Sequence, residues 1–159
     1  HIFYFGDKYS EPLNAKVDLQ GGKKISVKMG SYGIGISRLV AAIIEAKFNN
    51  NIMKWPISVS PYEVAIIPMI NKNDDTNLIK SQKIYKELIK HNIDVLLDDT
   101  DENISAKIKK FNLIGIPYQI IIGQKSEGDL FEFKEIDKES QNLSLDKVVQ
   151  KLTKEKNSI

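Results

Sequence analysis

Hydrophobic and polar positions alternate with two different periods in the first third of the chain. Ile25, Val27 and Met29 are separated by polar residues, which is the period of a half-buried strand. From Ile36 to about Phe48 the apolar residues instead recur at helical spacing. A glycine-containing turn separates the two segments. This stretch therefore predicts a strand, a turn and a helix in direct succession.

After residue 61 the pattern changes to short apolar runs that alternate with amphipathic segments. The runs predict strands and the amphipathic segments predict helices. The expected elements are a strand at 64–67, a helix from 75 or 76 to about 91, a strand at 93–97, a helix at 105–113, strands at 118–122 and 130–133, and a final helix that begins at 144. The order β-α-β-α-β-β-α predicts an α/β fold, and a hairpin between the last two strands makes its sheet mixed.

Two prolines mark the predicted boundary between the two parts of the chain. Pro56 and Pro61 fix the backbone and lack an N–H group, so the segment around them is not expected to form regular structure. We therefore predict a first domain piece at residues 1–54, a linker at 55–61 and a second domain at 62–159.

Composition limits the kinds of partner that the chain can have. The 159 residues are 42% hydrophobic and 28% charged, as in ordinary globular proteins, and the formal net charge is only +2. Such a balance gives no global basic field, so any contact with RNA must be local. The chain has no cysteine, which excludes disulfides and thiolate metal sites, and its two histidines are far apart in sequence. No metal site is therefore expected.

The sequence also carries no apolar run of membrane-spanning length and no secretory leader at its start. We expect a cytoplasmic protein without a membrane partner. An aromatic strand follows directly after His1, which favours a position inside a larger protein.

The turn between the first predicted strand and helix is a candidate nucleotide site. Gly33 and Gly35 allow backbone N–H groups to approach a ligand, and a helix N-terminus attracts an anion. Arg38 lies on the first helical turn, where a planar and permanently charged guanidinium can stack on a base or pair with phosphate. The spacing is not that of the dinucleotide fingerprint. A tight turn without a ligand therefore remains the alternative.

The segment Gly33-Ile34-Gly35-Ile36-Ser37-Arg38, with Met29-Gly30 before it, resembles the third signature motif of class II aminoacyl-tRNA synthetases in its bacterial prolyl-tRNA synthetase form. The resemblance implies that Gly33 and Gly35 make room for ATP. It also implies that Arg38 acts in catalysis by packing on the adenine and contacting the phosphates.

The same resemblance implies a proline pocket. Ser31 lies where many bacterial relatives carry a cysteine near that pocket. The stretch at 1–11, which begins with His1, is similar to one in which the family's histidine lies beside the bound amino acid. A histidine left by an expression tag is the alternative for His1.

The second part of the chain resembles the anticodon-binding domain of these enzymes, at residues 64–68, 95–99 and 113–117. The first two class II motifs and an editing domain have no counterpart, so the chain resembles the C-terminal portion of the enzyme, and we expect it to be inactive alone. The resemblance implies that the full-length enzyme is a homodimer that uses ATP, magnesium, proline and the tRNA for proline.

The resemblance places anticodon reading in the segment at 98–105 and the helix after it. We expect Asp99, Glu102 and Lys107 to contact the anticodon. The segment lacks two arginines and a Pro-Gly pair that are common in the family, with Thr100, Asn103, Ile104 and Ser105 in their place. Lys107, Lys109 and Lys110 on the following helix can supply some of the missing charge, and Lys107 and Lys110 share a helix face. A solvated face without RNA is the alternative for these lysines.

Two other functions remain open at this stage. The chain can be a stand-alone RNA-binding accessory module related to the anticodon-binding domain. It can also be a nucleotide-binding regulatory domain without RNA, although this leaves the matches at 95–99 and 113–117 unexplained.

Overall fold

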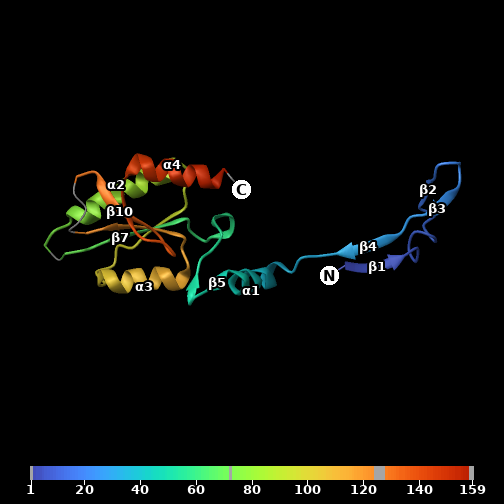
Figure 1. Cartoon of the computed structure of the whole chain (residues 1–159), viewed down its shortest axis with the longest axis horizontal. Helices are drawn as coiled ribbons and strands as arrows, with labels where there is room; N and C mark the ends of the chain where they lie inside the picture. The colour runs from blue at the N-terminus through green and yellow to red at the C-terminus, as the bar shows by residue number, and fades with distance from the viewer. Residues whose placement is uncertain (1, 72, 124–127, 158–159) are drawn as a thin grey trace. The chain divides into compact units, whose positions relative to one another are not determined.

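The computed structural model describes residues 2–71, 73–123 and 128–157, and it divides the chain into two compact units (Figure 1). The first unit comprises residues 1–42 and the second residues 43–159.

The first unit is built from two antiparallel strand pairs and the beginning of a helix. β1 (Ile2–Gly6) pairs with β4 (Met29–Tyr32), and β2 (Lys16–Asp18) pairs with β3 (Lys24–Ser26). The predicted strand over 25–29 is thus divided in two, because the chain changes its pairing partner from β2 to β1 between residues 26 and 29. α1 (Ile36–Lys47) follows β4, and none of its residues is buried.

The second unit contains a mixed five-stranded sheet, in agreement with the predicted α/β class. Its strands are β7 (Val64–Pro68), β8 (Val95–Leu97), β9 (Tyr118–Ile122), β10 (Leu130–Glu135) and β11 (Gln141–Ser144), in the order β11-β10-β9-β7-β8. β7 pairs in parallel with both β8 and β9, whereas β10 is antiparallel to β9 and β11. All five residues of β7 and of β9 are buried, as expected for central parallel strands.

Helices cover both faces of this sheet. α2 (Thr76–Lys90) and α4 (Leu145–Lys156) lie on one face, and α3 (Ile104–Ile114) lies on the other (Figure 1). The core under α2 and α4 includes Leu88 and Leu152, together with Tyr118 and Phe133 of the sheet. The smaller core under α3 is centred on Phe111.

Four short elements of the second unit were not predicted. β11 has the sequence Gln-Asn-Leu-Ser, which is too polar to be identified as a strand from its pattern. β5 (Phe48–Asn49) and β6 (Ile52–Met53) form a small hairpin. A 3₁₀ helix, η1 (Ile57–Val59), lies inside the predicted linker, so the prolines at its two ends bound a single turn rather than excluding regular structure.

The segment at residues 53–55, called the docked segment below, packs against the end of α3. Met53 is buried. The Trp55 indole Nε1 donates to the carbonyl oxygen of Ile114 at 2.8 Å, and the Trp55 backbone N–H donates to Gly115 O at 3.1 Å. These contacts agree with the division of the chain, in which residues 43–61 belong to the second unit. The domain boundary predicted at 55–61 stays a prediction.

In the ranges that the structure describes, no helix is both long enough and apolar enough to span a membrane.

Candidate nucleic-acid interface

The loop after β8, residues 98–103, begins at the carboxyl end of a parallel strand. The connection from β7 to β8 places a strand on one side of β7, and the connection from β8 to β9 places the next strand on the other side. α2 and α3 therefore leave on opposite faces. In open α/β sheets such a reversal of strand order leaves room for a ligand at the carboxyl edge.

Local hydrogen bonds determine the conformation of this loop. Asp98 Oδ1 accepts hydrogen bonds from the backbone N–H of Thr100, at 3.1 Å, and from the Thr100 hydroxyl group. The bond to the backbone N–H forms an Asx turn. Asn103 caps α3, because its Oδ1 accepts from the Ser105 backbone N–H at 2.8 Å. The loop is thereby fixed at both ends.

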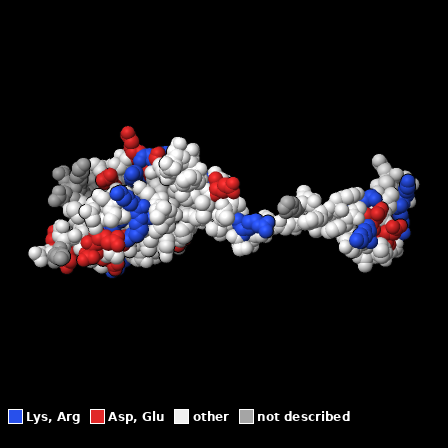
Figure 2. Space-filling model, turned by 90° about the horizontal axis from the view of Figure 1, so that it is seen from below, with Lys and Arg blue, Asp and Glu red and all other residues white. Residues whose placement is uncertain are grey.

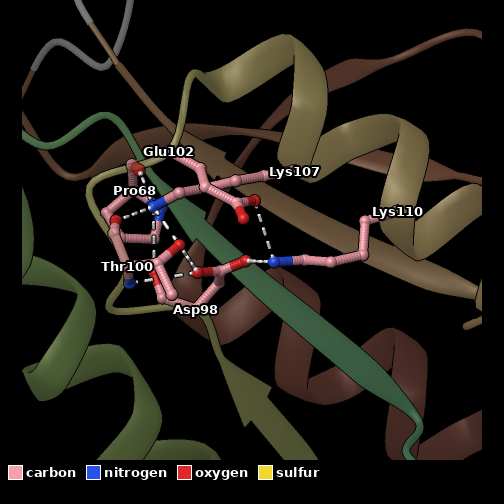
Figure 3. A network of polar contacts seen from close by, with 6 residues as sticks. All are labelled: Pro68, Asp98, Thr100, Glu102, Lys107 and Lys110. Atoms are coloured by element: carbon pink, nitrogen blue, oxygen red, sulfur yellow. Dashed lines mark hydrogen bonds and ion pairs between the residues drawn. The ribbon is translucent and has the colours of Figure 1, made fainter.

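Lys107 lies beneath the loop and has no exposed surface. Its ammonium group donates to the carbonyl oxygens of Thr100 at 2.6 Å, Asp98 at 3.2 Å and Pro68 at 3.2 Å (Figure 3). It also lies 3.7 Å from Asp98 Oδ1. An ammonium group has three N–H donors, so these carbonyl oxygens use all of them.

Lys110 bridges two carboxylates of the loop. Its Nζ lies 2.7 Å from Asp98 Oδ2 and 3.2 Å from Glu102 Oε2 (Figure 3). Burial raises the pKa of Asp98, but hydrogen bonds from Lys110 and Thr100 outweigh it, so this pKa lies below its ordinary value. The pKa of Lys110 is raised by its hydrogen bonds to Asp98 and Glu102. Both groups are therefore charged at neutral pH.

The structure brings together the three predicted anticodon residues but gives them different surroundings. Asp99 and Glu102 are exposed, so their carboxylates can accept hydrogen bonds from a base. Lys107 is fully buried, and the expected direct contact of its ammonium with RNA is not open to it in this conformation. Lys107 and Lys110 lie on the same face of α3, as their spacing predicts, and both side chains lie near Asp98.

Asp98 and Thr100 belong to this network but were not among the predicted site residues. Aspartate favours local turns, because its side chain can accept from the backbone N–H two residues on. The sequence thus contained a sign of the turn, although not of its partners on α3.

The predicted nucleotide and proline residues lie in the first unit. Ser31 is on β4, where it pairs with Phe3 of β1. Gly33 and Gly35 form the turn before α1, and Arg38 is exposed on the first turn of that helix. A Cβ atom at Gly33 would meet nothing within 4 Å, so packing within the described chain does not require glycine there. His1 lies outside the described residues.

Charge on the α3 side of the second unit is mixed rather than uniformly basic. Figure 2 shows acidic and basic side chains next to one another on this face. Coulombic attraction for a phosphate backbone is correspondingly modest.

Comparisons with known proteins agree with the resemblance predicted from the motifs. Residues 63–155 match the family model described as the anticodon binding domain. The chain is 65% identical over 158 residues to the proline–tRNA ligase of Pelagibacter ubique (strain HTCC1062), which is 98% of this chain and 36% of the relative.

Two further relatives carry the same name. The chain is 50% identical over 126 residues to the proline–tRNA ligase of Wolbachia sp. subsp. Brugia malayi (strain TRS), covering 79% of this chain and 29% of the relative. It is 47% identical over 133 residues to the proline–tRNA ligase of Prochlorococcus marinus subsp. pastoris (strain CCMP1986 / NIES-2087 / MED4). This match covers 84% of this chain and 22% of the relative. The chain thus spans between 22% and 36% of the length of these relatives.

Proposed function

We propose that this chain, which belongs to the anticodon-binding domain family, is part of a proline–tRNA ligase and recognises the anticodon of the tRNA for proline. The observation that carries the proposal is the similarity to proline–tRNA ligases over nearly the whole chain. The proposal is supported by the exposed carboxylates of Asp99 and Glu102, which lie on a loop held at both ends by hydrogen bonds.

Recognition at this loop would depend on base edges more than on phosphates. The Watson–Crick edge of guanine carries two N–H donors, and a carboxylate accepts from such donors. Of the nearby cations, Lys107 is buried and Lys110 is already paired with Asp98 and Glu102. Few positive charges remain to release counterions from RNA, so binding should be specific but weak.

The first unit would contribute to the ATP site of the same ligase. The full-length enzyme would join proline to ATP, giving prolyl-adenylate and pyrophosphate, and would then transfer the prolyl group to tRNA. Gly33 and Gly35 would leave space for the nucleotide, and Arg38 would neutralise phosphate charge and stack on the base. Ser31 and His1 would lie at the proline pocket.

The use of magnesium is also proposed for the full-length enzyme. Within residues 2–71, 73–123 and 128–157, no group of three or more histidine, cysteine or acidic side chains is placed to hold a metal ion. These residues do not fit a magnesium site, and no step through magnesium is assigned to them.

The rest of the ligase would cover the apolar surface of the first unit. Ile2 is 81% exposed, Tyr4 73% and Tyr32 84%, although they lie on paired strands. Large exposed apolar residues in such number are typical of a surface that is buried in a larger assembly.

We also propose that the full-length ligase is a homodimer and that it acts in the cytoplasm.

Titration of the 159-residue chain with an RNA anticodon arm tests the proposal. One arm carries the two guanines of the proline anticodon, and in a second arm both are replaced. We expect the first to bind more tightly, with a shallow dependence on salt. Equal affinities would refute anticodon reading, and a steep salt dependence without discrimination would favour a stand-alone RNA-binding module.

Replacing Glu102 with alanine sharpens the same test. If its carboxylate accepts from a guanine edge, discrimination between the two arms should fall by about 1 to 3 kcal/mol, while the slope of affinity against salt stays nearly constant. A change in the slope with discrimination intact would mean that Glu102 acts only through the overall charge.

A further inference from the structure

Lys107 connects three separate segments at the carboxyl edge of the sheet. The side chain comes from α3, and its acceptors are the last residue of β7, Pro68, and two residues of the loop after β8, Asp98 and Thr100. Figure 3 shows the ammonium group between these carbonyl oxygens.

Burial makes this arrangement hard to open. A buried ammonium group without acceptors is strongly unfavourable, whereas here all three of its donors are satisfied and Asp98 supplies a compensating charge. If the loop moved away, the charge would lose two carbonyl acceptors at once. The Lys107 contacts therefore favour one loop conformation over the alternatives.

The network continues from the buried lysine to the surface. Asp98 contacts both Lys107 and Lys110, and Lys110 in turn lies beside the exposed carboxylate of Glu102. Asp99 is adjacent in sequence to the held residue Asp98. Both carboxylates expected to meet RNA thus depend on a loop that Lys107 holds from below.

We propose that Lys107 is a positioning residue for anticodon recognition, which holds residues 98–102 in the conformation that presents Asp99 and Glu102 and does not touch RNA itself. This inference rests on the proposed function.

The variant Lys107→Met in the 159-residue chain tests the inference, with Lys109→Met as a matched control. Lys109 lies on the same helix and is exposed, so its variant removes an equal charge without touching the buried network. Two properties are measured: amide hydrogen exchange of residues 98–102 without RNA, and affinity for the two anticodon arms at several salt concentrations.

We expect Lys107→Met to raise amide exchange in the loop by about tenfold or more while β9 stays protected. Discrimination between the arms should fall by about tenfold, with an unchanged salt slope, because no phosphate contact is lost. Lys109→Met should leave loop exchange and discrimination unchanged. Unchanged loop exchange in Lys107→Met would overturn the proposed hold on the loop.

Other outcomes separate the inference from the proposed function. Faster loop exchange with full discrimination would limit Lys107 to a structural role and refute positioning. A salt slope reduced by about 0.7, the value of one single-strand phosphate contact, would mean that Lys107 contacts RNA directly. Equal binding of both arms by the unsubstituted chain would refute anticodon reading, whereas the exchange measurement would still test the hold on the loop.

Amine labelling of the unsubstituted chain covers the case in which Lys107→Met does not fold. A limiting amount of acetic anhydride should label Lys107 more slowly than Lys109, both with and without the anticodon arm. Ready labelling of Lys107 in the free chain that RNA suppresses would overturn the inference, because it would indicate an exposed lysine that binds RNA.

Discussion

Asp98 is a buried carboxylate that lies beside the ammonium groups of both Lys107 and Lys110. It is 6% exposed, and it lies within 3.7 Å of Lys107 and 2.7 Å of Lys110. A buried carboxylate between two ammonium groups compensates both, and removing its charge leaves the deeply buried lysine without an anion. Asp98 should therefore matter for stability, while Asp99 beside it matters for binding.

We predict that Asp98→Asn lowers the free energy of unfolding by about 2 to 4 kcal/mol at neutral pH, because a buried ammonium group loses its counter-charge. Asparagine can still accept from Thr100 through Oδ1, but an NH2 group in place of Oδ2 cannot accept from Lys110, so the effect combines the lost charge with that lost contact. Urea unfolding measures it. Asp101→Asn, at an exposed position of the same loop, should change stability by less than about 0.5 kcal/mol. Equal effects of the two variants would contradict the prediction.

The pH dependence of the same pair gives a separate prediction. The pKa of folded Asp98 lies below its ordinary value of 3.8. Its charge therefore stabilises the fold above that value, and this contribution is lost as the pH falls through the folded pKa. The stability difference between the unsubstituted chain and Asp98→Asn should shrink as the pH is lowered from about 4 to 2. A difference that stays constant over this range would exclude a titrating Asp98 as its source.

Single residues also mark the limit of what the sequence predicted about the site. The acidic segment after β8 was identified from its resemblance, and Asp99 and Glu102 are exposed there as an RNA-binding role requires. The burial of Lys107 was not predicted, because lysine is seldom fully buried. Only the three-dimensional path of the chain places carbonyl oxygens from two segments around its ammonium group.

Among the elements, the buried strands were predicted best. β9 coincides with its predicted range, because a run of five buried residues has a strong apolar signal. β11 was missed because its stability comes from pairing with β10 and not from its own polar sequence. Edge strands depend on tertiary context, and single-sequence patterns do not contain that context.

The C-terminal end of α3 is determined by a glycine and by the docked segment that packs against it. Gly115 ends the helix with φ at +84°, and its N–H donates to Phe111 O. A Cβ atom there would lie 2.9 Å from the backbone oxygen of Met53, closer than real contacts allow. Glycine is thus required both for the turn and for the approach of the docked segment.

We predict that Gly115→Ala destabilises the second unit by about 2 to 4 kcal/mol, from the left-handed backbone together with the clash against Met53. Gly128→Ala is the matched control, because Gly128 has φ at +57° and open space around its Cβ position. It should lose only about 1 kcal/mol, the backbone part alone. Urea unfolding of both variants provides the comparison. Equal losses would show that the docked segment yields without cost.

At the scale of the whole molecule, the proposed ATP site at Gly33, Gly35 and Arg38 is not accompanied in this chain by the first two class II motifs. We predict that the 159-residue chain gives no proline-dependent pyrophosphate exchange above a blank.

In the full-length enzyme, Arg38→Ala should lower kcat/KM for ATP by an equivalent of about 2 to 4 kcal/mol, through loss of one electrostatic donor. Lys47→Ala, on the last turn of the same helix, is the control and should leave ATP kinetics unchanged. Unchanged kinetics for Arg38→Ala would remove it from the site.

The sequence and the structure indicate different starting points for the C-terminal unit. Proline content predicts a domain that begins at residue 62, whereas contacts assign residues 43–61 to the second unit. Met53 is buried against it, Trp55 donates to Ile114, and Lys54 pairs with Glu135 and Asp137. Burial of one methionine contributes about 1.5 to 3 kcal/mol and each hydrogen bond about 0.5 to 1.5 kcal/mol, so the docked segment is not energetically neutral.

We therefore predict that the fragment 62–159 is less stable than the fragment 43–159 by about 2 to 4 kcal/mol. Amide hydrogen exchange of β9 measures this difference, because the central strand becomes exposed only when the whole unit unfolds. The fragment 43–159 should protect β9 as well as the 159-residue chain does, since both core clusters lie within it. If 62–159 protected β9 equally well, the boundary predicted from the prolines would define the folding unit, and the docked segment would add contacts without stability.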